Sequence, residues 1–167
     1  VLVDPKQGKY IIRLYKDGKW QLVTIDDRIP CNKEGYPAFG HNKIKNEIWV
    51  VILEKAVAKL LGSYEALHGG YMEEGIVLLT GGRPERLYIN NWRNKKGRKI
   101  YKQDRLWEKL VTYHKEKVMM GCCISSGKEQ REETTGLVAA HAYAIMDVRM
   151  TSDKRYRLLK LRNPWGF

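Results

Sequence analysis

The sequence lacks any long run of apolar residues, and it has no charged-then-apolar leader. No stretch approaches the roughly 20 residues that a membrane-spanning helix needs, so we expect a soluble chain without a membrane span. It also lacks internal repeats and low-complexity segments, which argues against a solenoid or a repetitive linker. With 43% apolar residues, ten tyrosines and five tryptophans, the 167 residues have the composition of one globular domain.

Cysteine is scarce and is not arranged as a scaffold. The three cysteines are Cys31, Cys122 and Cys123. Because their number is odd and no Cys-x-x-Cys spacing occurs, the sequence argues against a disulfide framework and a zinc site, and favours a reducing, cytoplasmic compartment. His41, His68 and His114 have no metal-ligand spacing to another histidine or cysteine. No cofactor is evident in this chain.

Acidic residues are outnumbered by basic ones, 19 to 31, which gives a net charge of +12. Such an excess suits anionic partners such as nucleic acid, phospholipid or acidic protein. The charges are nevertheless spread along the chain, and the one dense run, residues 93–99, has only Trp92 and Tyr101 as nearby aromatics, a poor platform for base stacking. We favour a solvated basic surface and keep nucleic-acid or acidic-membrane binding as a lesser alternative.

The first half of the sequence predicts a hairpin followed by helices. Residues 9–15 and 20–26 are rich in β-branched and aromatic residues, and Asp17-Gly18 between them is a strong hairpin signal. An ordered loop is expected over residues 30–41. Apolar residues at helical spacing then predict a helix over residues 47–61, capped by Asn46 and ended by Gly62. A short helix over 63–67 and a turn at 81–84 should follow.

The second half predicts one further helix and antiparallel strands. Asp104 is expected to cap a helix that extends to Lys117, and the short apolar run 118–124 predicts a buried strand. Residues 125–135 are a polar loop that leads into a final hairpin. This order of strands and helices predicts the α+β class, with antiparallel sheets and flanking helices.

The final hairpin carries the most informative residues, His141 and Asn163. Between them lies a cluster of turn formers, residues 150–154, centred on Ser152. If the flanking segments pair about that centre, residues whose numbers sum to 304 face each other. His141 then lies opposite Asn163, with Cβ atoms roughly 5 Å apart. The same register pairs Tyr143 with Leu161 and Ile145 with Leu159.

A histidine opposed to an asparagine suits thiol chemistry. A cysteine nucleophile needs a base that holds it as the thiolate, and the imidazolium needs a third group that fixes its ring. The Asn163 carbonyl can accept from the far ring N–H, and Trp165, two residues beyond, can shield that bond. Pro164 lacks an amide donor and should end the strand pairing. Each residue alone is more often structural, so the hypothesis depends on their combination.

Several ordered motifs extend this hypothesis to a family. They are Ile25-Asp-Asp-Arg-Ile-Pro30, the segment from Asn46-Glu-Ile-Trp49 to Gly69-Gly70, Thr80-Gly-Gly82, Gly136-Leu-Val-x-x-His141-Ala-Tyr143 and Arg162-Asn-Pro-Trp-Gly166. Together they cover nearly the whole chain, from about residue 10 to residue 166. The sequence resembles the calpain-type cysteine proteases, which have a papain-like fold.

The resemblance implies that residues 1–167 are a single subdomain of a longer chain, the half of the protease core that supplies histidine and asparagine. His141 would be the general base, Asn163 its orienting group and Trp165 the shield of their bond. The nucleophilic cysteine would come from a separate, preceding subdomain, which is therefore the expected partner. The three cysteines of this chain do not match the nucleophile's position and are interpreted as structural. Alone, the chain should be inactive; the complete enzyme would be a calcium-regulated endopeptidase acting on protein substrates.

Two departures from the family pattern matter. Ala140 stands where the family usually has glycine, and its methyl group is expected to tighten the cleft. The family's calcium ligands in this subdomain lie mostly beyond the Asn-Pro-Trp-Gly motif. Calcium is therefore implied for the complete enzyme, whereas no metal site is expected in this chain.

The alternative is a non-catalytic calpain-like module that binds partners after losing its chemistry. Intact His141, Asn163 and Trp165 argue against it, because a pseudoenzyme has no chemical need of all three. The residues encoded before Val1 distinguish the two hypotheses. A serine or glycine at the nucleophile position there would favour the non-catalytic module.

Overall fold

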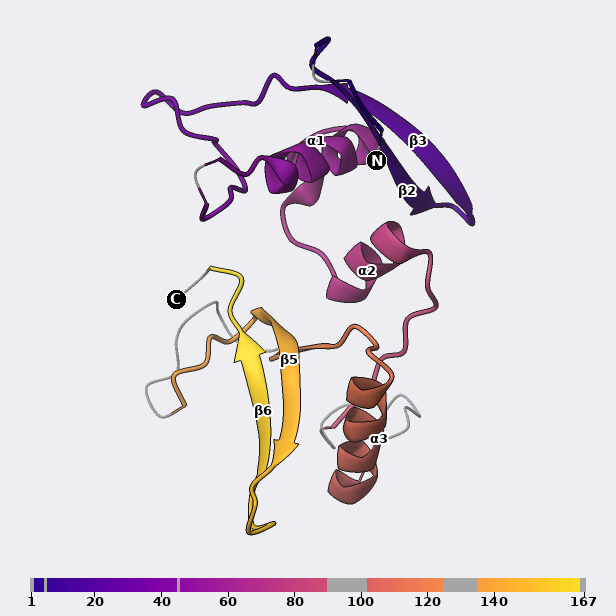
Figure 1. Cartoon of the computed structure of the whole chain (residues 1–167), viewed down its shortest axis with the longest axis vertical. Coiled ribbons are helices and arrows are strands. Elements are labelled where there is room, and N and C mark those ends of the chain that lie inside the picture. Colours follow the sequence, from indigo (N-terminus) through magenta and orange to yellow (C-terminus); the bar gives the residue numbers. More distant parts are fainter. Residues whose placement is uncertain (1, 5, 45, 90–101, 125–134, 166–167) are drawn as a thin grey trace. The chain divides into compact units, whose positions relative to one another are not determined.

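A computed structural model of the chain describes residues 2–4, 6–44, 46–89, 102–124 and 135–165. It divides into two compact units, Val1–Pro84 and Glu85–Phe167 (Figure 1). Each contains a three-stranded antiparallel sheet and at least one helix, so the predicted α+β class is confirmed. No helix in these ranges is long and apolar enough to cross a membrane. That residues 1–167 form a single subdomain stays a prediction, and the basic run 93–99 lies outside the described residues.

The first unit begins with a three-stranded sheet and continues with helices. Its elements are β1 (Leu2–Asp4), β2 (Lys9–Lys16), β3 (Lys19–Asp26), α1 (Trp49–Leu61), the 3-10 helix η1 (Glu65–Leu67) and α2 (Met72–Thr80). The predicted hairpin is confirmed as β2 and β3, with Lys16 paired to Lys19. Asp17 and Gly18 between them have φ of 53° and 76°, the left-handed conformations that a two-residue turn of this kind requires. Strand β1 was not predicted.

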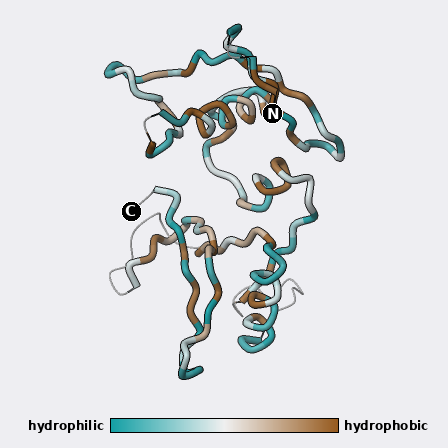
Figure 2. The backbone as a smooth tube through the Cα atoms, viewed as in Figure 1, coloured by the Kyte–Doolittle hydropathy of each residue, from teal (hydrophilic) through white to brown (hydrophobic). Residues whose placement is uncertain are grey.

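Alternation along the hairpin places the core of this unit on one face of the sheet. Four buried residues of β2 and β3 pack with three from α1; they are Ile12, Leu14, Val23, Ile25, Val51, Ile52 and Ala56. Leu14 is fully buried, with no exposed surface. Figure 2 shows the corresponding hydrophobic stretches in α1 and in the hairpin. Burial of this apolar surface is what holds the helix on the sheet.

The helix that the sequence predicts over residues 47–61 is present as α1, but the predicted cap is wrong. The helix begins at Trp49, and its N-cap residue, Ile48, offers no side-chain hydrogen bond. Asn42, not Asn46, serves this end, because its side-chain oxygen accepts the backbone N–H of Val50 at 3.3 Å. The far end agrees with the prediction: Gly62 has φ of 111° and donates its N–H to Ala58 O at 2.8 Å.

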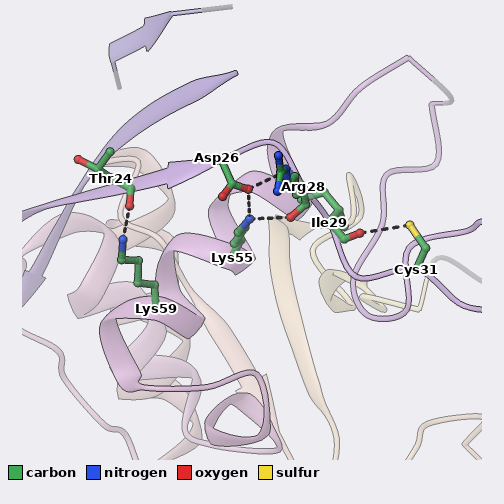
Figure 3. A network of polar contacts seen from close by, with 7 residues as sticks. All are labelled: Thr24, Asp26, Arg28, Ile29, Cys31, Lys55 and Lys59. Carbon is green, nitrogen blue, oxygen red and sulfur yellow. Dashed lines mark hydrogen bonds and ion pairs between the residues drawn. The ribbon is translucent and has the colours of Figure 1, made fainter. Parts of the chain in front are cut away.

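Two lysines of α1 attach the helix to the end of β3 (Figure 3). Lys55 forms an ion pair with Asp26, and Lys59 donates to the backbone oxygen of Thr24 at 2.7 Å. The same Asp26 carboxylate accepts the backbone N–H of Arg28 at 2.9 Å, which closes a turn after the strand. The bond from Lys55, followed by that from Arg28, lowers the pKa of Asp26. These contacts fix the turn that precedes the 30–41 loop.

Helix α2 was not predicted, although its end was. The sequence predicted only a turn at residues 81–84, and Gly81 is the left-handed C-cap of α2, with φ of 67° and its N–H bonded to Val77 O at 2.7 Å. A β-carbon built on Gly81 would lie 2.9 Å from the Trp20 ring. Helix and hairpin therefore approach too closely at this point for any side chain. The predicted 63–67 helix is present as the shorter η1.

The second unit contains one helix and a sheet of strand order β4-β5-β6. Its elements are α3 (Gln103–Lys115), β4 (Gly121–Cys123), β5 (Ala142–Met150) and β6 (Arg157–Arg162). Asp104 was wrongly predicted as the cap of α3. It lies in the first turn, and its carboxylate accepts from Arg157 Nη2 at 2.8 Å. The buried strand predicted over 118–124 is shorter and only partly buried, because β4 pairs on one side with β5 and leaves Cys123 exposed.

The predicted register of the final hairpin is wrong by two to three residues. Leu161 pairs with Ile145, not with Tyr143, and Leu159 pairs with Val148. Two features shift the pairing. The connection covers residues 151–156, so its centre lies beyond Ser152, and a bulge at Met146 adds one unpaired residue to β5.

Candidate functional site

The structure brings together the two side chains predicted to meet. His141 directly precedes β5, and Asn163 directly follows β6, at the same end of the hairpin. His141 Nε2 lies 2.9 Å from Asn163 Oδ1, within hydrogen-bonding distance. His141 is only 8% exposed and Asn163 is partly buried, so this bond is partly withdrawn from water.

The two residues meet along a diagonal of the hairpin and not as a directly opposed pair. Continuing the Ala144–Arg162 pair by one residue places Asn163 opposite Tyr143. His141 lies two residues before Tyr143 and therefore on the same face of the sheet. Diagonal neighbours on one face are about 7–8 Å apart at the backbone, a gap that an imidazole and an amide can bridge. The predicted contact thus forms in a register other than the predicted one.

The Asn163 side chain is held in one orientation by a second donor. Its Oδ1 also accepts the backbone N–H of Trp165 at 3.0 Å, across Pro164, which closes an Asx turn. Because this atom accepts a backbone N–H, it is the amide oxygen. His141 Nε2 must then carry a proton, and in the neutral ring the basic lone pair is on Nδ1.

The Trp165 indole lies against the imidazole. The two ring centroids are 4.3 Å apart, with their planes at 45°, while Trp165 as a residue is 45% exposed. The indole therefore covers part of the imidazole and keeps its other surface toward solvent. The indole thus lies where a side chain that shields the His141–Asn163 bond would lie. The shielding role itself stays a prediction.

Sequence reasoning missed the part that Tyr143 takes in this site. The Tyr143 ring lies edge-to-face against His141, with centroids 5.1 Å apart and planes at 87°. Its hydroxyl oxygen accepts the backbone N–H of Val138 at 2.8 Å in a buried position. The available signal was an aromatic residue two positions after the histidine, on the same face of the strand.

Ala140, immediately before His141, adopts the left-handed conformation, with φ of 51°. An alanine in this region is strained by about 1–2 kcal/mol because its Cβ approaches the following carbonyl, whereas glycine is not. The positive φ at this position therefore explains why glycine suits it better than alanine. Ala140 is exposed.

Replacing Ala140 by glycine is expected to stabilise the protein. Relief of strain should exceed the entropic cost of glycine by about 0.5–1 kcal/mol in the free energy of unfolding. Urea unfolding of the wild type and Ala140→Gly measures the difference. Ala144→Gly is the matched control, because Ala144 is also exposed but lies in regular strand β5, where glycine should destabilise. If both variants lose the same free energy of unfolding, the prediction is contradicted.

The three cysteines lie in different surroundings. All three are free thiols, and burial, followed by the neighbouring Cys123, raises the pKa of Cys122, which disfavours its thiolate. Cys31 belongs to the first unit, where its Sγ donates to Ile29 O at 3.3 Å. Over the described ranges, no three His, Cys, Asp or Glu side chains are grouped so that they could hold a metal ion. No chemical step is assigned to calcium.

Comparison with known proteins identifies the family. A family model described as calpain family cysteine protease matches residues 2–167. The chain is 39% identical to the calpain-type cysteine protease DEK1 of Zea mays over 169 residues, which cover 99% of this chain and 8% of that protein. It is 37% identical to Calpain-12 of Homo sapiens over 161 residues, covering 95% of this chain and 21% of that protein. The chain thus spans a small part of its relatives and belongs to the calpain family of cysteine proteases.

Proposed function

We propose that this chain is the subdomain of a calpain-type endopeptidase that supplies the general base and its orienting amide. The hydrogen bond from His141 Nε2 to Asn163 Oδ1, 2.9 Å long, is the observation that carries the proposal. With Nε2 as the donor, Nδ1 is the nitrogen that takes the proton of a cysteine thiol. The nucleophilic cysteine belongs to a preceding subdomain.

The chemistry follows from this assignment. The thiolate attacks the carbonyl carbon of a peptide bond in a protein substrate, while the His141 imidazolium keeps its Nε2–H bonded to Asn163. The imidazolium then gives its Nδ1 proton to the departing amine, which leaves an acyl-enzyme. His141 next removes a proton from water, which hydrolyses the thioester and regenerates the thiol. Trp165 limits the access of water to the His141–Asn163 bond, because its indole covers part of the imidazole.

The proposal includes calcium regulation of the complete enzyme and a cytoplasmic location. Calcium regulation rests on the resemblance of the sequence to calpain-type proteases. The location is supported by the three cysteines, which form no disulfide with one another, as is usual in a reducing compartment.

Peptide cleavage tests the proposed function. The isolated chain is expected to show no proteolysis, whereas the complete protein should cleave a peptide substrate and lose this activity when its thiols are alkylated. Because alkylation also reaches exposed Cys31 and Cys123, the assay is repeated with Cys31→Ser and Cys123→Ser, which should keep full activity and full sensitivity. Cleavage that survives alkylation, or a complete protein without any cleavage, would refute the protease assignment and favour a non-catalytic binding module.

A further inference from the structure

We propose that Tyr143 is a positioning residue that fixes the His141 imidazole in the orientation that the reaction needs. This inference rests on the proposed function, since it assigns a role to a side chain that acts through the base. It is carried by two independent contacts of one tyrosine. The hydroxyl holds the backbone that leads into His141, and the ring holds the imidazole itself.

The Tyr143 hydroxyl attaches the segment that precedes β5 to β5 itself. Tyr143 is 7% exposed and Val138 is 5% exposed, so the 2.8 Å bond from Val138 N–H to the phenolic oxygen is buried. Tyr143 belongs to β5, which begins at Ala142, whereas Val138 precedes it. The bond therefore closes a short loop that contains His141. Without the hydroxyl, the Val138 N–H is left without this partner in a buried position, where an unpaired donor is costly.

The backbone conformation of that loop is not favoured by its own residues. Ala140 is in the left-handed region, with φ of 51°, a conformation that alanine adopts only when its surroundings impose it. The bond from Val138 to Tyr143 spans this residue and is one such constraint. The position of the His141 backbone thus depends on the tyrosine hydroxyl.

The ring contact restricts the imidazole after the backbone has been placed. The Tyr143 ring is edge-to-face with the His141 ring, and the Trp165 ring is tilted by 45° against it. Edge-to-face packing is a favourable geometry for aromatic rings. Rotation of the imidazole away from Asn163 would disrupt both contacts. The Tyr143 ring and the Asn163 side chain therefore both restrict rotation of the His141 imidazole, each through a different contact.

The test compares two substitutions at this position in the complete protease. Tyr143→Phe keeps the ring and removes the hydroxyl, and it is expected to lower kcat by about tenfold while KM changes by less than about twofold, since a displaced base acts on the chemical step. Tyr143→Leu also removes the ring and should lower kcat further, to about 100-fold. Val148→Ala is the control, because Val148 is likewise 7% exposed and on β5, five residues farther along.

A second readout separates positioning from stability. The ¹⁵N chemical shifts of the His141 ring report which nitrogen carries the proton, and Tyr143→Phe should reduce the Nε2–H form, whereas Val148→Ala should not. Circular dichroism establishes that each variant is folded at the assay temperature. Unchanged kcat and ring shifts in Tyr143→Phe, or an equal loss of kcat in Val148→Ala, would overturn the inference. If His141→Ala retains turnover, it is instead the proposed function that fails.

Discussion

Replacing His141 by alanine in the complete protease is expected to lower kcat/KM by roughly 10⁴-fold or more, the scale of loss when a nucleophile is deprived of its base. The reason is chemical and not structural. Alanine cannot take the thiol proton or return it to the leaving amine, and the Asn163 oxygen, which lies 2.9 Å from Nε2, loses one of its two donors. Initial rates of peptide cleavage, measured with wild type and variant at equal folded concentration, give the ratio.

His114→Ala is the matched control for this measurement. His114 is in the same unit, and its Nε2 lies 3.1 Å from Asp147 Oδ1, so that it also takes part in a polar contact. It is at the end of α3 and not beside Asn163. Its substitution should leave turnover within about twofold of wild type, because this half-buried contact does not involve His141 or Asn163. Comparable rates for wild type and the His141 variant would contradict the assignment of His141 as the base.

The parts of the fold that the sequence predicted are those governed by local rules. Asp17-Gly18 supplies the positive φ angles of a tight turn wherever it occurs between two strands, and Gly62 ends a helix for the same reason. The β-branched and aromatic residues of 9–15 and 20–26 likewise predict the strands β2 and β3. Such signals depend on one residue or on its near neighbours.

The incorrect predictions depend on contacts between distant residues. Asn46 and Asp104 are good capping residues by type, yet an oxygen from Asn42 serves the first helix and the Asp104 carboxylate binds Arg157 of β6. Helix α2 is only nine residues long and contains Gly75, so that its local preference for a helix is weak. Tertiary packing decides such cases, and a single sequence does not display it.

The candidate site was predicted through an argument with one incorrect step. A turn centred on Ser152 would have opposed His141 and Asn163 directly, whereas the longer connection and the bulge at Met146 place them diagonally. The contact survives because His141 remains on the same face as the position opposite Asn163, and both side chains are long enough to meet. What the sequence could not reveal was the hydroxyl of Tyr143, because its partner is a backbone N–H whose position depends on the fold.

Removal of the amide at Asn163 should cost less than removal of the base, but still about 100-fold in kcat, with KM changed by less than about twofold. In Asn163→Ala the His141 Nε2–H and the Trp165 N–H both lose this acceptor, so that the ring can turn and the Asx turn can open. Asn163→Asp keeps an oxygen for both donors and should therefore retain more activity than Asn163→Ala. Steady-state kinetics of the two variants measure the difference.

A double-mutant cycle decides whether Asn163 acts through His141. If the amide only orients the imidazole, then Asn163→Ala should lower the residual rate of the His141→Ala variant by less than about twofold, because there is no ring left to orient. A further loss near 100-fold in that background would mean that Asn163 acts on the substrate or on the fold. The fold can be assessed separately, since loss of the Trp165 bond alone should lower the free energy of unfolding by only about 1 kcal/mol. The cycle therefore distinguishes an orienting amide from a structural one.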